Sequence, residues 1–251
     1  MAALHRVAHR GYCAVAPENT LPALVAGVLA GATFIEFDVR TTADGVPVVI
    51  HDRTVDRTTG SCGKVWELTL DEIRELDAGS WFSPAYAGLR IPRLTEVLDV
   101  LRPHAVGGHG VELLLEIKPP ATLEQVKNII GQVADAGLLD RTVVQSFDPA
   151  VLRLVEQAAP ELRRGLLRDG FDAEQVAVAR ELGVGYCNPS MAAVLAAPGT
   201  VAALAEAGVA VMPWTANDSA IWPALVDAGV AGIISDRTGE LTGWATARGT
   251  A

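Results

Sequence analysis

The sequence predicts an α/β fold, a (β/α)₈ barrel of the TIM type with a small insertion after the second barrel strand, as one domain over residues 1–251. Short apolar, β-branched runs alternate with longer Ala-, Leu- and Glu-rich stretches of helical spacing, which is typical of a parallel sheet. Eight such runs and eight such stretches can be counted, the number that a closed barrel needs. A doubly wound open sheet also remains possible, because periodicity does not show closure.

The expected strands are 4–9, 33–40, 111–117, 142–146, 164–167, 185–188, 210–214 and 232–235. The expected helices are 20–30, 95–101, 123–136, 149–159, 173–182, 199–207, 220–228 and a last turn from Thr238. Several helices end in a glycine before the next strand, as left-handed C-caps do: Gly31, Gly137, Gly183, Gly208 and Gly229. We expect a surface loop at 103–110.

The second expected strand is followed by a segment that breaks this rhythm. A turn at 43–45 leads to a strand at 46–51 that returns as a hairpin. The next segment, 52–92, is too long for an ordinary strand–helix loop and forms the expected insertion subdomain. Within it Thr69 and Glu72 predict a capping box. Four aromatic residues indicate that the insertion is folded over the barrel mouth or contacts a second subunit of a homodimer: Trp66, Trp81, Phe82 and Tyr86.

Composition narrows the class of protein. The net charge of −10 argues against a nucleic-acid-binding protein, so a phosphate ligand would need local positive charge, such as a divalent cation with a few Arg and Lys residues. Cys13, Cys62 and Cys187 are odd in number and lack a CxxC pair, which favours free thiols in a reducing compartment. The sequence shows neither a signal-peptide pattern nor an apolar run long enough for a bilayer. We therefore expect a cytoplasmic protein without stable membrane insertion.

Two carboxylates give the sharpest functional signal. Glu36 and Asp38 lie two residues apart on the second strand, so both side chains point to one face, inside the barrel mouth. Inward carboxylates repel unless they are protonated or share a cation, and Mg²⁺ and Ca²⁺ prefer oxygen ligands. On the third strand, Glu116 could be a further ligand and Lys118 a phosphate clamp. A structural Glu–Lys ion pair is the alternative.

Histidines follow the first barrel strand and the returning strand. His9 and His51 could supply an acid and a base for substitution at phosphorus, and Arg10 could bind phosphate oxygens. The alternatives are a strand-end histidine bonded to a backbone carbonyl and a loop histidine. Glu18 could serve phosphate or metal binding, although Asn19 or Thr20 beside it is typical of a helix N-cap.

Signals in the second half of the chain are weaker. Trp214, at the end of the seventh strand, could pack on glycerol or another small alcohol, although core filling is the commoner use. We expect Asp236 to cap the last helix. No active-site role is expected for the other three histidines, for Cys13, or for two arginines that serve the insertion's surface or rim: His5, His104, His109, Arg53 and Arg57.

The order of these blocks is more specific than any one of them. The sequence resembles the glycerophosphodiester phosphodiesterase family in His9-Arg10-Gly11, Pro17-Glu18-Asn19-Thr20, Glu36-x-Asp38, His51-Asp52 and Glu116-x-Lys118. The resemblance implies a barrel that cleaves a small-molecule glycerophosphodiester to glycerol 3-phosphate and an alcohol. It implies Glu36, Asp38 and Glu116 as ligands of one divalent cation, Mg²⁺ or Ca²⁺ with Mn²⁺ possible. It also implies His9 and His51 as the acid–base pair, and Arg10 and Lys118 as phosphate contacts.

Three other functions use a similar barrel. A phosphodiesterase acting on lysophospholipids would need an apolar trough for the acyl chain. A non-catalytic barrel that binds a phosphate ligand would have lost at least one acid–base or metal residue, and none is missing here. A sugar-phosphate isomerase or aldolase barrel usually holds its phosphate near the last two strands, whereas this acidic cluster lies on strands two and three.

Overall fold

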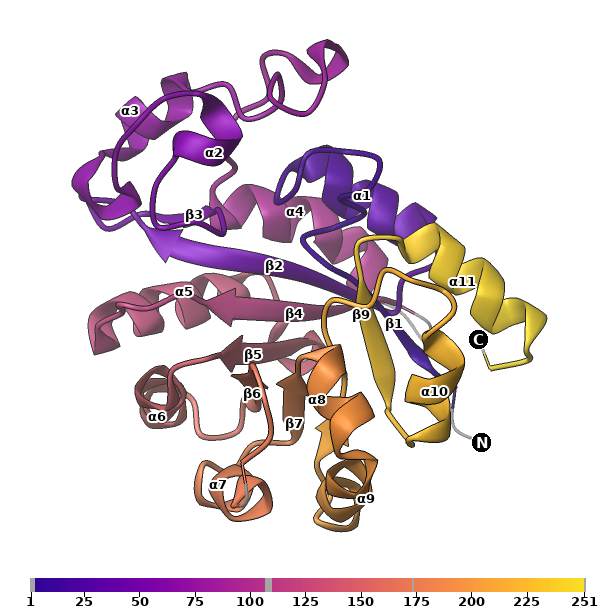
Figure 1. The fold of residues 1–251 in the computed structure, drawn as a ribbon. Helices are drawn as coiled ribbons and strands as arrows, with labels where there is room; N and C mark the ends of the chain where they lie inside the picture. The colour runs from indigo at the N-terminus through magenta and orange to yellow at the C-terminus, as the bar shows by residue number, and fades with distance from the viewer. Residues whose placement is uncertain (1–2, 107–109, 173, 251) are drawn as a thin grey trace.

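Eight parallel strands form the centre of the fold. The structure is a computed structural model that describes residues 3–106, 110–172 and 174–250. The order of the strands in the sheet is β8-β7-β6-β5-β4-β2-β1-β9 (Figure 1). The bounds are β1 (His5–Ala8), β2 (Phe34–Thr41), β4 (Glu112–Ile117), β5 (Thr142–Ser146), β6 (Arg163–Arg168), β7 (Tyr186–Pro189), β8 (Ala210–Val211) and β9 (Gly232–Ser235).

Backbone hydrogen bonds join the two ends of this sheet. The Ala231 N–H donates to the Val211 carbonyl at 2.8 Å, and the Ile234 N–H donates to the Pro213 carbonyl at 3.0 Å. The Ala216 N–H donates in turn to the Ile234 carbonyl at 2.9 Å. The barrel is therefore nearly closed, which confirms the predicted fold and excludes the open sheet. The seventh barrel strand is shorter than predicted, because Pro213 has no N–H to donate to a neighbouring strand.

Helices surround the barrel (Figure 1). They are α1 (Leu21–Leu29), α4 (Leu94–Ala105), α5 (Leu123–Asp135), α6 (Pro149–Ala158), α7 (Gln175–Glu181), α8 (Met191–Ala196), α9 (Pro198–Glu206), α10 (Trp222–Asp227) and α11 (Thr238–Ala247). The five glycines expected at helix ends all have positive φ, between 58° and 86°. In the part of the chain that the structure describes, every helix is too short or too polar to cross a membrane.

Two helices depart from the sequence-based expectation. Helix α8 was not expected; the Ser190 side chain accepts the Ala193 N–H at its start, as an N-cap does. Helix α4 continues through Pro103 to Ala105, where we expected a loop. Proline removes only one donor near the end of a helix, which here does not stop the last turn. Residues 107–109 of the expected loop lie outside the described residues.

Side chains along each strand point alternately to the surrounding helices and into the barrel interior, and both environments are apolar. Ile35, Phe37 and Val39 of β2 are fully buried against the helices. On the other face of β2, Phe34 joins a small apolar cluster inside the barrel with Val7, Leu114, Val143, Met212 and Ile234. This cluster fills the barrel interior below the strand ends, so the next inward-facing residues of β2 and β4 must emerge at the mouth.

Strand β3 (Pro47–Val49) pairs antiparallel with β2, as the expected hairpin required. The insertion follows, with α2 (Asp56–Thr59), η1 (Val65–Glu67), α3 (Leu70–Glu75) and η2 (Pro84–Tyr86). A capping box at Thr69 opens α3. The returning strand and the insertion share an apolar cluster, formed by Val48, Ile50, Val55, Val65, Ile73, Ala78 and Ile91.

The aromatic residues of the insertion do not cover the barrel mouth. Trp81, Phe82 and Tyr86 pack edge to face on one another, and the Tyr86 hydroxyl donates to the Val15 carbonyl at 2.8 Å. Among the described residues, none of 52–92 lines the cavity at the strand ends. The expectation of a covered mouth is wrong, because these rings find partners within the insertion and on the loop after β1.

Candidate active site

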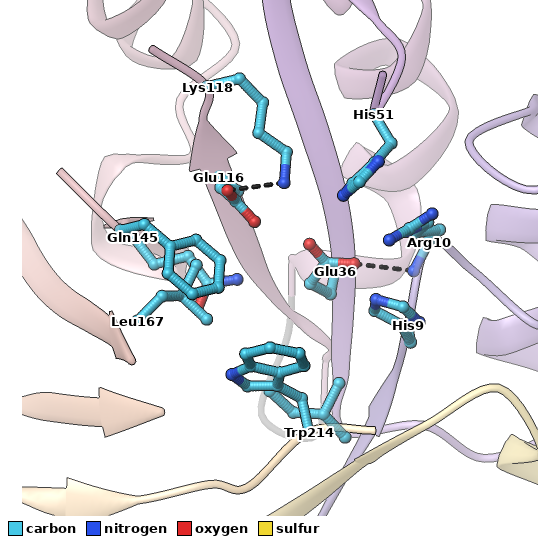
Figure 2. Close-up of a pocket in the computed structure, with 11 residues that line it drawn as sticks. His9, Arg10, Glu36, His51, Glu116, Lys118, Gln145, Leu167 and Trp214 are labelled. Carbon is cyan, nitrogen blue, oxygen red and sulfur yellow. Dashed lines mark hydrogen bonds and ion pairs between the residues drawn. The ribbon is translucent and has the colours of Figure 1, made fainter. Parts of the chain in front are cut away.

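A cavity of about 250 Å³ opens at the carboxyl ends of the strands (Figure 2). Most of the residues singled out in the sequence line it. The full lining is His9, Arg10, Glu36, His51, Glu116, Lys118, Gln145, Phe147, Leu167, Trp214 and Ile234. These side chains come from eight different strands or strand ends, so only barrel closure brings them together.

Three buried carboxylates lie close together at the strand ends, and two of them, Glu36 and Glu116, line the cavity. Asp38 and Glu116 are register partners on the adjacent strands β2 and β4, and Glu36 precedes Asp38 by two residues on the same face. Oxygens of Glu36, Asp38 and Glu116 all lie within 4.8 Å of one another. The donor set is all oxygen and closely spaced, which fits a hard divalent cation.

Two cationic residues partly neutralise this cluster. The Lys118 ammonium lies 3.0 Å from Asp38 Oδ1 and 2.6 Å from Glu116 Oε1. The Arg10 backbone N–H donates to Glu36 Oε2 at 2.7 Å, and the Arg10 φ of 52° places it in the left-handed region. Such a backbone conformation in a non-glycine residue is uncommon and concentrates at functional sites.

Lys118 and Arg10 do not fully compensate the negative charge of the three carboxylates. Burial, with the charges of Asp38 and Glu116, raises the pKa of Glu36 well above its usual range. Burial and the Asp38 charge raise the pKa of Glu116 to about 7. Burial also disfavours ionised Asp38, but the positive charges of Lys118 and Arg10 outweigh it and lower the pKa of Asp38. Two of the three carboxyls therefore favour protonation, and a bound cation would compensate their charge.

Asn19 serves the carboxylate cluster rather than the helix N-terminus. Its side-chain amide donates to Asp38 Oδ2 at 2.7 Å, and its amide oxygen accepts the Asp38 backbone N–H at 3.1 Å. Thr20 occupies the N-cap position of α1, but its hydroxyl donates to the Pro17 carbonyl instead of capping. Thr20 is thus the N-cap residue by position, as expected, but neither side chain caps the helix, because both have other partners.

His9 is held by a carboxylate that we expected to cap a helix. Its Nδ1 lies 2.6 Å from Asp236 Oδ1, and the second Asp236 oxygen accepts the Asn217 amide at 2.6 Å. The Cys13 thiol also donates to Asp236 Oδ1, at 3.0 Å. Helix α11 has no side-chain cap. The expectation for Asp236 is wrong, since its side chain turns towards β1, and the Nε2 atom of His9 is left for the cavity.

His51 is held in the same way. Its Nδ1 lies 2.7 Å from Asp52 Oδ1, and Arg57 Nε donates to the other Asp52 oxygen at 2.7 Å. Arg57 also binds Glu18 through two nitrogens, at 2.7 and 2.8 Å. Glu18 in turn accepts from Arg10 Nη1 at 2.7 Å. A continuous chain of ion pairs therefore links the insertion to the first strand loop.

These ion pairs give Glu18 and Arg57 positions that differ from those expected from the sequence. Glu18 is not among the residues that line the cavity, and it contacts Arg10 from the side. Arg57 was expected to serve only the insertion's surface or rim, but it orients Asp52 behind His51. No sequence pattern separates Arg57 from Arg53; the only available signal was the charge of Asp52 directly after His51.

An apolar wall completes the cavity. The Trp214 indole N–H donates to the Asn188 carbonyl at 2.8 Å, and its ring packs edge to face on Phe147. Leu167 lies across the cavity from Arg10 (Figure 2). His5 packs on Phe34 away from the cavity lining, His104 lies on α4, and His109 is outside the described residues.

Transfer at phosphorus requires positive charge at the phosphoryl oxygens together with a proton acceptor and a proton donor. A barrel that gathers both at its strand ends defines an enzyme of the phosphodiesterase class. The model of the glycerophosphoryl diester phosphodiesterase family matches residues 9–240, and the chain belongs to this family.

Relatives and solved structures agree with this membership. A glycerophosphodiester phosphodiesterase of Caldanaerobacter subterraneus subsp. tengcongensis is 36% identical over 232 residues, covering 92% of this chain and 93% of that protein. The glycerophosphodiester phosphodiesterase structure from Agrobacterium tumefaciens strain C58 has a TM-score of 0.82 at 30% identity, covering 97% of this chain and 100% of that one.

A phosphodiesterase from Oleispira antarctica, solved with the product sn-glycerol-3-phosphate, has a TM-score of 0.85 at 27% identity and covers 98% of this chain and 97% of that one. The resemblance seen in the sequence is confirmed, and the chain is a phosphoric diester hydrolase.

Proposed function

We propose that this enzyme hydrolyses glycerophosphodiesters to glycerol 3-phosphate and an alcohol, with a divalent cation on Glu36, Asp38 and Glu116. One observation carries the proposal: two histidines, each with Nδ1 on an aspartate, line the same cavity as Glu36 and Glu116 of the carboxylate cluster. The glycerol-3-phosphate bound by the Oleispira antarctica relative supports the same product here.

The carboxylate cluster would hold Mg²⁺ or Ca²⁺, with Mn²⁺ as a further candidate. When bound, such a cation withdraws negative charge from the phosphoryl oxygens. Arg10 and Lys118 bind the remaining phosphate oxygens, since both line the cavity. Glu18 is an anion and would repel phosphate, so its role is to orient Arg10 through their ion pair. Trp214 packs on the carbon skeleton of an alcohol.

The two histidines divide the proton transfers. One Nε2 accepts the proton of the nucleophile, which is water or the neighbouring hydroxyl of the substrate; in the second case a cyclic phosphate forms first and water then opens it to glycerol 3-phosphate. The other donates a proton to the leaving oxygen as the bond from phosphorus to that oxygen breaks. Asp236 and Asp52 hold the rings in position and stabilise the protonated forms. The burial of His51 lowers its pKa, which favours the neutral form that a proton acceptor needs.

The insertion supports this site from outside. We propose that the segment 52–92 acts as a subdomain that fixes His51, because Arg57 contributes the second ion pair of Asp52 and also binds Glu18. The complete set of ion pairs argues for catalysis over a barrel that only binds phosphate.

The test is a metal-dependent assay. The purified protein is stripped with EDTA, and release of glycerol 3-phosphate from glycerophosphocholine and glycerophosphoethanolamine is measured without metal and with Mg²⁺, Ca²⁺ or Mn²⁺. Glu36→Gln and His51→Ala are compared with the matched controls Glu124→Gln, exposed on α5, and His104→Ala on α4.

We expect a metal to restore activity in the parent and in both controls. His51→Ala should lower kcat by about 10²–10⁴-fold, and Glu36→Gln should abolish the metal response. Absence of turnover on every diester and metal, from protein that remains folded, would refute the proposed reaction. Cleavage of lysophospholipids alone would transfer the assignment to that substrate class.

A further inference from the structure

A second cavity, of about 470 Å³, lies beside the catalytic cavity. The two cavities share Phe147 and Leu167 as lining residues, so they adjoin along one apolar edge. The rest of the second cavity is formed by the residues at and after the end of β6: Arg168, Asp169, Gly170, Phe171 and Asp172. A diester held at the catalytic cavity can therefore extend one of its two alcohol groups into this space.

The walls of the second cavity combine aromatic surface with negative charge. Phe147 and Phe171 are each only partly buried and leave ring surface for a ligand. Arg168 forms an ion pair with Asp172, and its Nε also donates to Gln175 Oε1 at 3.3 Å. Asp169 is exposed, and among the described residues its carboxylate has neither an ion pair nor a hydrogen bond. One arginine against two aspartates leaves the lining with a net negative charge.

We propose that this cavity binds the alcohol headgroup of the diester and prefers a cationic amino alcohol of the choline or ethanolamine type, an inference that rests on the proposed function. Aromatic faces attract a quaternary ammonium group, and the free Asp169 carboxylate adds a favourable charge. Glycerol is neutral and needs hydrogen-bond partners, which the carboxylates, Lys118 and Gln145 of the catalytic cavity offer. An acyl chain would have to displace water from three charged side chains, which disfavours a lipid tail.

The test compares a cationic with a neutral headgroup. KM and kcat are measured for glycerophosphocholine and for glycerophosphoglycerol with Asp169→Asn, Phe171→Leu and the parent. Asp135→Asn, on the exposed face of α5, makes the same charge change away from the cavity and serves as the control. Choline binding is followed by calorimetry in parallel, because it needs no turnover.

We expect Asp169→Asn and Phe171→Leu each to raise KM for glycerophosphocholine about three- to tenfold. The kcat values, and both parameters for glycerophosphoglycerol, should stay within about twofold. Choline should bind more weakly to Asp169→Asn by the same factor and unchanged to Asp135→Asn.

Equal effects on the two substrates, or choline binding that ignores Asp169, would overturn the subsite. Loss of turnover on all diesters with choline binding intact would instead reject the proposed reaction and keep the ammonium site. A third outcome would be a higher kcat/KM for lysophosphatidylcholine than for glycerophosphocholine. If Phe171→Leu left this activity unchanged and Phe171→Asp abolished it, the cavity would be a trough for the acyl chain, and the headgroup subsite would be wrong.

Discussion

The buried Glu116 carboxylate lowers the free energy of unfolding of the metal-free protein by a measurable amount. Glu116 is 4% exposed, and the pKa of its carboxyl rises from an ordinary 4.5 to about 7 because of burial and the Asp38 charge. The unfolded chain therefore releases this proton at lower pH than the folded chain does. The free energy of unfolding therefore falls as pH rises from 4.5 to 7. Above pH 7 the carboxyl is ionised in both states, and the full cost of burying its charge is present.

The size of this cost follows from the two pKa values. At about 1.4 kcal/mol per pH unit, ionised Glu116 lowers the free energy of unfolding by about 3 kcal/mol at pH 8. Glu116→Gln keeps the shape without the charge, and Lys118 retains its ion pair with Asp38. In EDTA at pH 8 we expect the variant to have a Tm about 6–12 °C above the parent.

Thermal unfolding followed by circular dichroism checks this expectation. The difference in Tm should shrink to less than about 2 °C at pH 4.5, where the carboxyl is protonated in the folded state and half protonated in the unfolded chain. Glu124→Gln on the exposed face of α5 should leave Tm unchanged at both pH values. Saturating Mg²⁺ or Ca²⁺ should stabilise the parent by about 3 kcal/mol at a hundredfold excess over Kd, but not the variant. A variant less stable than the parent in EDTA at pH 8 would show that the ion pair with Lys118 outweighs the cost of burial.

Two further predictions concern residues behind the site. Asp236→Asn removes the carboxylate on His9 Nδ1 and should lower kcat about 10²–10⁴-fold with little change in KM; steady-state kinetics check this, and parent-like kcat would show that His9 needs no anion. Asn19→Ala removes the hydrogen bonds that the Asn19 side chain makes with Asp38 Oδ2 and with the Asp38 backbone N–H, and should raise the Kd for the divalent cation about 10–100-fold by calorimetry. Asn128→Ala on α5 is the control, and equal affinity in the two variants would contradict the role of Asn19.

Local pattern was enough to find the barrel and the residues that face its mouth. Glu36 and Asp38 could be assigned to one face because strand side chains alternate with a period of two, and the neighbours Ile35 and Phe37 are buried on the other face as that pattern requires. The helix-end glycines were identified for a similar reason, since a left-handed backbone conformation is unfavourable for residues that carry a Cβ atom. These features depend on a few adjacent residues and are written in the sequence.

Only the tertiary structure decided which side chains support the histidines. Asp236 is 227 residues from His9, and Arg57 reaches Glu18 across 39 residues. Neither spacing has a local signature, so Asp236 and Asn19 were interpreted as helix caps, which their positions before a helix also allow. Closure of the barrel and the hairpin of β3 place these groups within hydrogen-bonding distance. The sequence determined which polar side chains face the barrel mouth, whereas their partners depended on contacts between distant segments, which local periodicity does not encode.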